Sequence, residues 1–224
     1  MILFRYKFEK GGNFTENFKK LDLKKQEEII SVAFTEFANN GYKNTSTTEI
    51  AKKSCIGKGT LFFYFNTKND LYNYLIDYGI SYLKTNFIDK ISGQKQDFIE
   101  RCKQISKLKL IAYTEKPYIL NFFAKIYTDK DKQNISKNLH KRLDELVELM
   151  PKILYQNIDT ESFRSDLDKE TIMKLIKWCS DGYQAELILN LQRVEMSDML
   201  SKNDTTAWQD YDKFLKNLKK IFYK

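Results

Sequence analysis

The chain has 224 residues, a formal net charge of +8, two prolines, eight glycines, three cysteines and one histidine. The few, widely spaced cysteines argue against a disulfide scaffold, and one histidine without a Cys-x-x-Cys pair argues against a zinc site. No apolar run approaches the ~20 residues that cross a bilayer, and the first residues lack the hydrophobic region of a secretory signal. We therefore expect a reduced, cytoplasmic protein with no membrane, metal or cofactor.

The positive charge is concentrated toward the N-terminus. Residues 1–70 hold 12 Lys and Arg against 8 Asp and Glu, so half of the net charge falls in less than a third of the chain. Excess positive charge attracts polyanions. The distribution favours a nucleic acid as the partner of this region.

The scarcity of helix breakers predicts an all-α fold. Residues 1–20 show no clear period and are expected to form a flexible arm, with a minor-groove contact as the alternative. A first helix is expected over 22–39, with Asp22 as its N-cap. Gly41 then supplies the left-handed conformation that favours glycine at a helix end.

A second, shorter helix begins with the pattern of a capping box. In Ser46-Thr-Thr-Glu49, the Ser46 hydroxyl and the Glu49 carboxylate can satisfy each other's backbone amides. Ile56 and Gly57 form a turn before a helix over 58–64. Asn66 or Thr67 is then placed to cap the next helix.

The helix over 58–64 has one face for its neighbours and one for a partner. Leu61 and Phe65 lie four residues apart and can pack on the two preceding helices. The outward face at the start of the helix is left to Lys58, Gly59, Phe62 and Phe63. Two helices joined by a tight turn, the second basic and aromatic, are typical of the helix-turn-helix that enters a DNA major groove.

Each exposed group on this face has a use against DNA. Lys58 can donate to guanine or to a phosphate, Gly59 lets the backbone come close, and Thr60 offers a methyl or a hydroxyl. Lys68 lies in the first turn of the next helix, where a cation opposes the helix dipole by roughly 0.3–1 kcal/mol. A phosphate bound there removes the conflict.

Thr47 and Thr48, in the first turn of the second helix, are also placed to touch the DNA backbone. The alternative is that the lysines of this region are solvated surface. Agreement between capping, turn and charge favours the DNA-binding interpretation.

Four segments together form a specific signature: Phe37-Ala-Asn-Asn-Gly-Tyr42, Thr45 to Ala51, Ile56-Gly-Lys-Gly-Thr-Leu-Phe-Phe-Tyr-Phe65 and Lys68-Asn-Asp-Leu71. Over residues 24–75 the chain resembles the tetracycline-repressor (TetR) family of bacterial transcriptional regulators. The resemblance implies a three-helix DNA-binding head on a helical body that dimerises through its last two helices and takes up a small molecule. It also implies base-reading positions at Gly57, Lys58, Gly59, Thr60 and Phe62 and backbone-holding positions at Thr47, Phe63, Tyr64 and Lys68.

Two residues depart from the family pattern. Phe63 stands where members often have Tyr or His against a phosphate, and a phenyl ring cannot donate a hydrogen bond. Either Tyr64 takes over this role, or Phe63 makes an apolar contact with a sugar or a thymine methyl. Cys55 stands where a small residue, often glycine, fills the turn. We expect Cys55 to be structural, with a redox-sensing thiol as the less favoured alternative.

The remaining segments are expected to be helical over 68–91, 95–114, 117–128, 135–156, 168–197 and 205–223. Pro151 falls inside one of these patterns and should kink or end that helix. His140 is expected to be a surface or hydrogen-bonded histidine, because no second imidazole or thiolate lies near it in the sequence.

The last two helices carry apolar stripes at helical spacing. In the first the stripe includes Ile172, Ile176, Cys179, Tyr183, Leu187 and Leu191. In the second it includes Trp208, Tyr211, Leu215, Leu218 and Phe222. The stripes either meet their copies in a four-helix dimer interface or pack onto their own domain.

The many aromatic residues of the body suggest a ligand cavity, although plain core is the alternative. The candidate lining residues are Tyr113, Phe122, Phe123, Tyr127, Trp178 and Tyr183. Such a cavity suits a small hydrophobic or aromatic effector, or a cation held by ring faces.

We divide the chain into an arm (1–20), a helix-turn-helix domain (21–67) and an effector-binding and dimerisation domain (68–224). The predicted function is a homodimeric repressor, released from a palindromic operator by a small molecule. The alternatives are a transcriptional activator, or a ligand carrier or enzyme whose basic helix pair is incidental. No grouping of nucleophile, base or metal ligands supports an enzyme.

Overall fold

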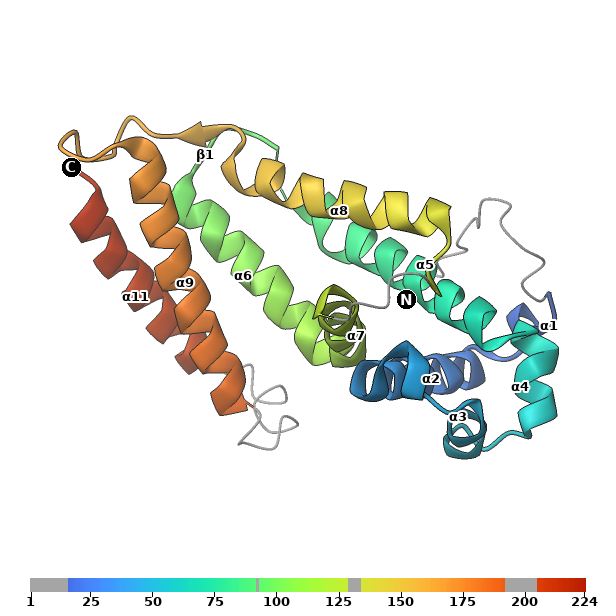
Figure 1. Ribbon diagram of the computed structural model, residues 1–224. Coiled ribbons are helices and arrows are strands. Elements are labelled where there is room, and N and C mark those ends of the chain that lie inside the picture. Colours follow the sequence, from blue (N-terminus) through green and yellow to red (C-terminus); the bar gives the residue numbers. More distant parts are fainter. Residues whose placement is uncertain (1–15, 92, 129–133, 192–204) are drawn as a thin grey trace. The chain divides into compact units, whose positions relative to one another are not determined.

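The computed structural model describes residues 16–91, 93–128, 134–191 and 205–224. Its described elements are helices, together with one short parallel pair of strands, and this confirms the all-α fold class (Figure 1). In the pair, β1 (Gln96–Asp97) lies beside β2 (Ile158–Asp159). None of the helices in the described part of the chain is long and apolar enough to span a membrane.

By their contacts the residues form two compact units, each considered by itself below. The first unit contains residues 1–81 and 116–144, and the second contains residues 82–115 and 145–224. The helices that begin in the first unit are α1 (Glu16–Lys19), α2 (Leu23–Asn44), α3 (Thr47–Lys53), α4 (Lys58–Phe65), α5 (Lys68–Asn86), α7 (Pro117–Thr128) and α8 (Lys137–Tyr155). Those of the second unit are the 3₁₀ helix η1 (Ile88–Lys90), α6 (Phe98–Glu115), α9 (Lys169–Leu191) and α11 (Thr205–Phe222).

In the first unit, α2 packs along α7 through aromatic side chains. Phe34 and Phe37 of α2 are buried, and their rings lie 5.0 Å and 6.4 Å from that of Phe122 on α7. Burial of one such ring removes enough apolar surface from water to contribute about 1.5–3 kcal/mol. This contact fixes the helix on which α3 and α4 are mounted.

The helix starts of the first unit follow the predicted capping pattern. The Asp22 carboxylate accepts from the amide three residues on at 2.9 Å, which confirms it as an N-cap. The Ser46 hydroxyl accepts from the amide of Glu49 at 3.4 Å, and that is one half of the predicted capping box. Of the two candidates for α5, Thr67 is the one that accepts from the amide of Asp70, at 3.0 Å.

The first predicted helix limit is confirmed: Gly41, two residues past Asn39, has a positive φ of 69° and non-helical dihedral angles that interrupt α2, and the helical turn up to Asn44 lies beyond this kink. Two later limits were wrong, for local reasons. The helix expected over 68–91 ends at Asn86, before η1. The helix expected from 95 begins at Phe98, because the residues before it pair in the small sheet.

Pro151 does not end α8, which continues to Tyr155. A proline inside a helix removes one backbone donor, and the neighbouring turns here remain helical. The helix predicted over 168–197 runs to Leu191, and its predicted last residues lie outside the described part of the chain.

The end of the predicted arm is packed. Residues 16–19 form α1, and Phe18 is buried against the rings of Phe65 and Tyr74 at 4.8 Å and 5.6 Å. Residues 1–15 lie outside the described residues. Helix α1 therefore belongs with the helix-turn-helix it precedes.

In the second unit, α6, α9 and α11 pack around one core. Most of the stripe residues predicted for a dimer interface belong to this core: Ile172, Ile176, Tyr211, Leu215, Leu218 and Phe222, all less than 9% exposed. Tyr183 and Trp208 pack against the same cluster, partly buried. These stripes thus follow the alternative of packing onto their own domain.

Candidate nucleic-acid interface and ligand cavity

The turn between α3 and α4 is closed by backbone hydrogen bonds. The amides of Ser54, Cys55 and Ile56 donate to carbonyls at the end of α3 at 3.0, 3.1 and 3.0 Å. Cys55 has a φ of 52° and an exposed side chain. A residue with positive φ is strained unless it is glycine, which gives a physical reason for glycine to be common at this turn.

Helix α4 has one buried face and one open face, as its sequence predicts. Leu61 and Phe65 are each 1% exposed, whereas Lys58 and Gly59 are exposed. A Cβ added at Gly59 would meet nothing within 4 Å. The start of α4 therefore offers an unobstructed backbone.

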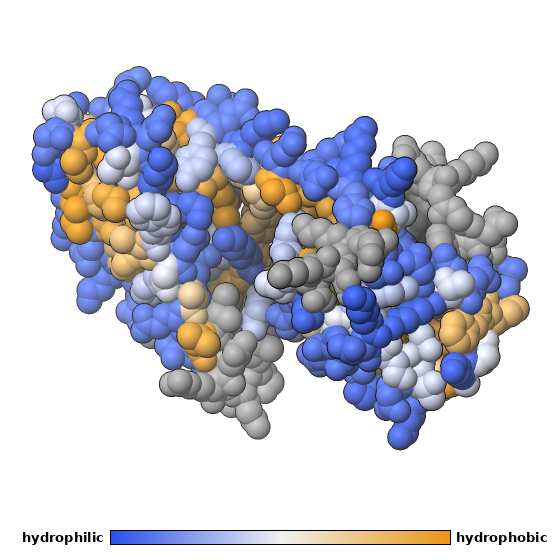
Figure 2. All heavy atoms as spheres, in the orientation of Figure 1, coloured by the Kyte–Doolittle hydropathy of each residue, from blue (hydrophilic) through white to orange (hydrophobic). Residues whose placement is uncertain are grey.

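The ring of Phe63 is 60% exposed, and Figure 2 shows apolar side chains gathered over α4. Thr60, Phe62 and Tyr64 are half-buried beside it. In the first turn of α3, Thr47 is half-buried and Thr48 is exposed. The predicted DNA-contacting residues from α3 to α4 are thus all at least partly accessible.

The lysines of this region differ in what they bind. Lys53 forms an ion pair with Glu36 at 2.5 Å, and this hydrogen bond raises the pKa of Lys53. Lys25 donates to the carbonyl of Ser54 at 2.7 Å and so holds the end of α3. Within the described residues Lys58 has no ion pair or hydrogen bond through its side chain, and its exposed ammonium stays available.

Lys68 is anchored to the end of α2. Its ammonium donates to the carbonyl of Lys43 at 3.1 Å and lies 4.8 Å from the centre of the Tyr42 ring. Burial lowers the pKa of Lys68. The unfavourable position at the start of α5 is thus offset by a favourable one at the C-terminus of α2. Sequence reasoning missed this contact, because 25 residues separate the partners.

A second feature absent from the sequence analysis is a charged network between α2, α5 and α7. The Glu27 carboxylate accepts from Lys116 at 2.7 Å, from Tyr78 at 3.3 Å and from Tyr118. Burial alone would raise the pKa of Glu27, but the bonds from Lys116, Tyr118 and Tyr78 together lower it. The network ties the first helix of the helix-turn-helix to two other helices of its unit.

The second unit contains a hollow of about 290 Å³, close to the lower limit of the usual range for ligand sites. Its interior is mainly apolar and includes the buried Cys102, whose pKa burial raises to about 12. Its other lining residues are Phe87, Ile105, Lys109, Met150, Pro151, Ile153, Leu154, Tyr155, Lys177, Ser180, Asp181 and Gln184.

None of the six residues predicted to line an effector cavity lines this hollow. Phe122 and Phe123 belong to the core of the first unit, where Tyr127 is 48% exposed. Tyr113 and Tyr183 are half-buried in the second unit, and Trp178 is 64% exposed. Aromatic residues are abundant in both cores, so ring content alone does not distinguish a cavity wall from ordinary core.

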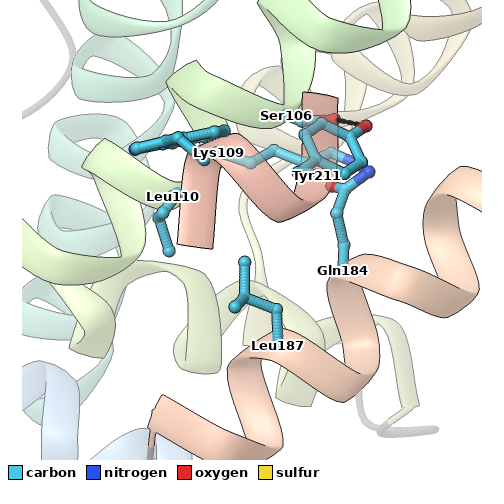
Figure 3. A pocket seen from close by; sticks show the side chains of 7 residues that line it. Ser106, Lys109, Leu110, Gln184, Leu187 and Tyr211 are labelled. Atoms are coloured by element: carbon cyan, nitrogen blue, oxygen red, sulfur yellow. Dashed lines mark hydrogen bonds between the residues drawn. The ribbon is translucent and has the colours of Figure 1, made fainter. Parts of the chain in front are cut away.

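A smaller hollow of about 20 Å³ shares Lys109 and Gln184 with the larger one. In Figure 3, Gln184 and Leu187 reach toward it from α9, and Ser106 and Tyr211 are joined by a hydrogen bond. The Tyr211 hydroxyl lies 2.6 Å from the hydroxyl of Ser106 and 2.7 Å from that of Ser180. This buried, uncharged network joins α6, α9 and α11.

Helix α9 also has an exposed apolar face, on a different side from its core stripe. Trp178, Gly182, Ala185 and Leu189 are exposed and are spaced four, three and four residues apart, so they lie on one face. Of the remaining dimer candidates, Cys179 is exposed and Leu187 is half-buried, and the side chain of Leu191 lies outside what is described.

The described residues contain no group of three or more His, Cys, Asp or Glu side chains that could hold a metal ion. The His140 ring lies 3.2 Å from the carbonyl of Ile135 through Nδ1, as expected for a hydrogen-bonded histidine.

Comparisons with known proteins place this geometry in context. Residues 29–75 match the family described as bacterial regulatory proteins, tetR family. The fatty acid metabolism regulator protein of Bacillus subtilis (strain 168) is 22% identical over 174 residues, which cover 75% of this chain and 86% of that protein.

Two solved structures have a similar fold. A TetR family transcriptional regulator from Chloroflexus aurantiacus J-10-FL is 21% identical, with a TM-score of 0.61 over 94% of this chain and 98% of that one. The ketosteroid transcriptional regulator KstR2 of Mycobacterium tuberculosis is 17% identical, with a TM-score of 0.58 over 92% and 97% of the two chains. The matched segment of the family contains α3, the turn and α4.

Proposed function

We propose that the chain, whose residues 29–75 match the tetR family of bacterial regulatory proteins, is a homodimeric transcriptional repressor of that family and that a small molecule releases it from a palindromic operator. Residues 21–67 are the DNA-binding part of this proposal, and residues 68–224 bind the effector and form the dimer. The observation that carries the proposal is the open face of α4, where Lys58 and Gly59 are exposed above the buried Leu61 and Phe65.

On DNA, the start of α4 would read bases from the major groove. Gly57, Lys58, Gly59, Thr60 and Phe62 are the proposed base-reading residues. Thr47, Thr48, Phe63, Tyr64 and Lys68 would hold the sugar-phosphate backbone, with Tyr64 supplying the hydroxyl that Phe63 lacks. Lys68 would bind the backbone from its position at the end of α2, where its ammonium retains N–H donors for a phosphate.

Two lysine variants test this division of roles. Lys58→Ala should reduce the preference for operator over random DNA, by about 1–3 kcal/mol if Lys58 reads a guanine. Lys68→Ala should weaken binding to all sequences and reduce the salt slope by about one. Lys95→Ala, a change to a surface lysine of the second unit paired with Asp159 and Glu161, is the matched control. Equal protection of every sequence in footprinting of the unaltered protein would refute operator recognition.

The proposed dimer uses the exposed face of α9. Gly182 and Ala185 are small enough to let two helices approach, and Trp178 and Leu189 can bury their exposed side chains against the copy. A Cβ at Gly182 would meet nothing within 4 Å of its own protomer, so the approach is open. The apolar stripes of α9 and α11 are already buried against their own protomer, in the core of the second unit.

A charge on this face should break the dimer. Leu189→Glu is expected to shift the protein from dimer to monomer in sedimentation velocity. Ile111→Glu is the matched control, because Ile111 is also exposed (46%) in the second unit but lies on α6. Dimers that survive Leu189→Glu unchanged would place the interface elsewhere.

The proposed effector site is the 290 Å³ hollow of the second unit. Its apolar interior suits a hydrophobic effector, and the relatives named as regulators of fatty acid metabolism and ketosteroids point to the same class of molecule. An effector bound there would contact one side of α9, and the proposed dimer face is another side of the same helix. This arrangement supports release from DNA through a change at the dimer interface.

A further inference from the structure

From the charges around the large hollow, we propose that it binds an apolar carboxylate and that Asp181 occupies the place of the ligand's carboxylate in the free protein. The inference rests on the proposed function, since the hollow is the proposed effector site. It goes beyond that function by naming the head group and the residues that hold it.

The charged residues of the hollow come from two helices. Lys177 and Asp181, one turn apart on α9, form an ion pair, and Lys109 of α6 lies 3.9 Å from the other oxygen of Asp181. Their side chains are 36%, 41% and 49% exposed, so the three charges lie where the hollow meets solvent. Two ammonium groups against one carboxylate leave a net positive charge, which favours an anion over a cation.

Of the two lysines, Lys109 has the ammonium whose N–H donors are available to a ligand. Its contact with Asp181 is too long for a hydrogen bond, and in the described part of the chain it has no closer acidic partner. The aspartate is therefore shared unequally, held mainly by Lys177. A ligand carboxylate that takes the place of Asp181 between the two lysines can give Lys109 the close acceptor that Asp181 does not provide.

Two uncharged polar side chains that line the hollow, those of Ser180 and Gln184, are already hydrogen-bonded. The Ser180 hydroxyl pairs with that of Tyr211, and the Gln184 amide donates to both the carbonyl and the hydroxyl of Ser180, at 3.1 Å each. Burial keeps the Cys102 thiol in its neutral form. The interior thus selects for apolar groups and leaves recognition of charge to Lys109 and Lys177.

The volume limits the size of the apolar part. At about 30 Å³ for each water-sized group, 290 Å³ holds roughly ten heavy atoms. A chain of nine or ten carbons fills this space while its carboxylate remains at the lysines. Decanoate is the matching probe.

Binding of sodium decanoate to the unaltered full-length protein, measured by calorimetry, tests the proposal. Decanol and decyltrimethylammonium carry the same chain with a neutral and a cationic head. We expect decanoate to bind at least about fivefold more tightly than either, the size of effect expected of one partly exposed ion pair. Equal binding of decanol, tighter binding of the cation, or no binding of decanoate would overturn the proposal.

Variants at the charged residues give the sharper result. Lys177→Met and Lys109→Met should each weaken decanoate binding by roughly fivefold, whereas Asp181→Asn should strengthen it by a similar factor because the competing carboxylate is gone. Lys95→Met and Asp166→Asn are the matched controls; both residues are in ion pairs of the second unit away from the hollow. An Asp181→Asn protein that binds decanoate more weakly than the unaltered one would refute the role given to Asp181.

Two further variants locate the site. Ile105→Trp, inside the hollow, should abolish decanoate binding, and Met150→Trp serves the same purpose if the first variant loses its helical circular dichroism. Binding that persists in a folded variant would place the ligand elsewhere. Operator binding measured without decanoate separates the two proposals: its failure refutes the proposed function, whereas failure to bind decanoate refutes the carboxylate inference alone.

Discussion

Two hydrogen-bonded networks, one in each unit, hold three helices together by different chemistry. In the first unit the carboxylate of Glu27 accepts from Lys116 and two tyrosines and remains partly exposed. In the second unit the hydroxyl of Tyr211, 1% exposed, bonds two serine hydroxyls. The charged network therefore depends on pH, whereas the neutral one depends on complete pairing of its buried groups.

The largest effect is expected at the neutral network. Tyr211→Phe should lower the free energy of unfolding by about 1–3 kcal/mol, because it leaves the hydroxyls of Ser106 and Ser180 short of a buried partner. Urea denaturation measures this loss, which should be nearly the same from pH 5 to pH 8. The double variant that combines Tyr211→Phe with Ser106→Ala should lose less stability than the sum of the losses in the two single variants. Simple additivity would mean that the two hydroxyls are not coupled.

A smaller, pH-dependent effect is expected at the charged network. Glu27→Gln should cost about 1 kcal/mol at pH 7, since the carboxylate is partly exposed and its ion pair is partly screened. The pKa of Glu27 is lowered on folding, so its contribution is present above the ordinary value of 4.5 and is lost as pH falls below it. The difference between variant and unaltered protein should shrink on acidification; a constant difference would contradict the assignment.

The smallest effect on stability lies outside both networks, at Gly59. Replacement of a helical glycine by alanine gains about 0.5–1 kcal/mol, and Gly59→Ala meets no neighbouring atom. We expect a slightly more stable protein that binds its operator more weakly, because a methyl group now separates α4 from the bases. Gly79→Ala is the contrasting variant: its Cβ would lie 2.6 Å from the Phe123 ring, so it should destabilise the protein.

The contrast also shows what the sequence could predict. N-caps at Asp22 and Ser46 and the buried pair Leu61 and Phe65 depend on neighbours within a few residues, and they were found. The bond from Lys116 to Glu27 joins residues 89 positions apart, and no local pattern indicates it.

On α9 and α11, the apolar stripe predicted which side of each helix is buried, but it did not predict whether the same chain or a second copy covers that side. Tyr211 and Leu215 were candidates for a partner copy, and α6 and α9 of the same unit cover them. The face now proposed for the dimer is marked by small residues, Gly182 and Ala185, which a search for large apolar side chains passes over. The hollow was missed in the same way, because its charged residues look like ordinary surface groups.

The hydrogen bond from the Lys68 ammonium to the carbonyl of Lys43 has a kinetic consequence for DNA binding. A free lysine side chain loses rotamer entropy when it binds a phosphate, but the side chain of Lys68 is already held in place at the end of α2. Its preorganisation should speed the step from a loosely docked encounter to the seated complex, so the Lys68→Ala protein should also reach its operator more slowly.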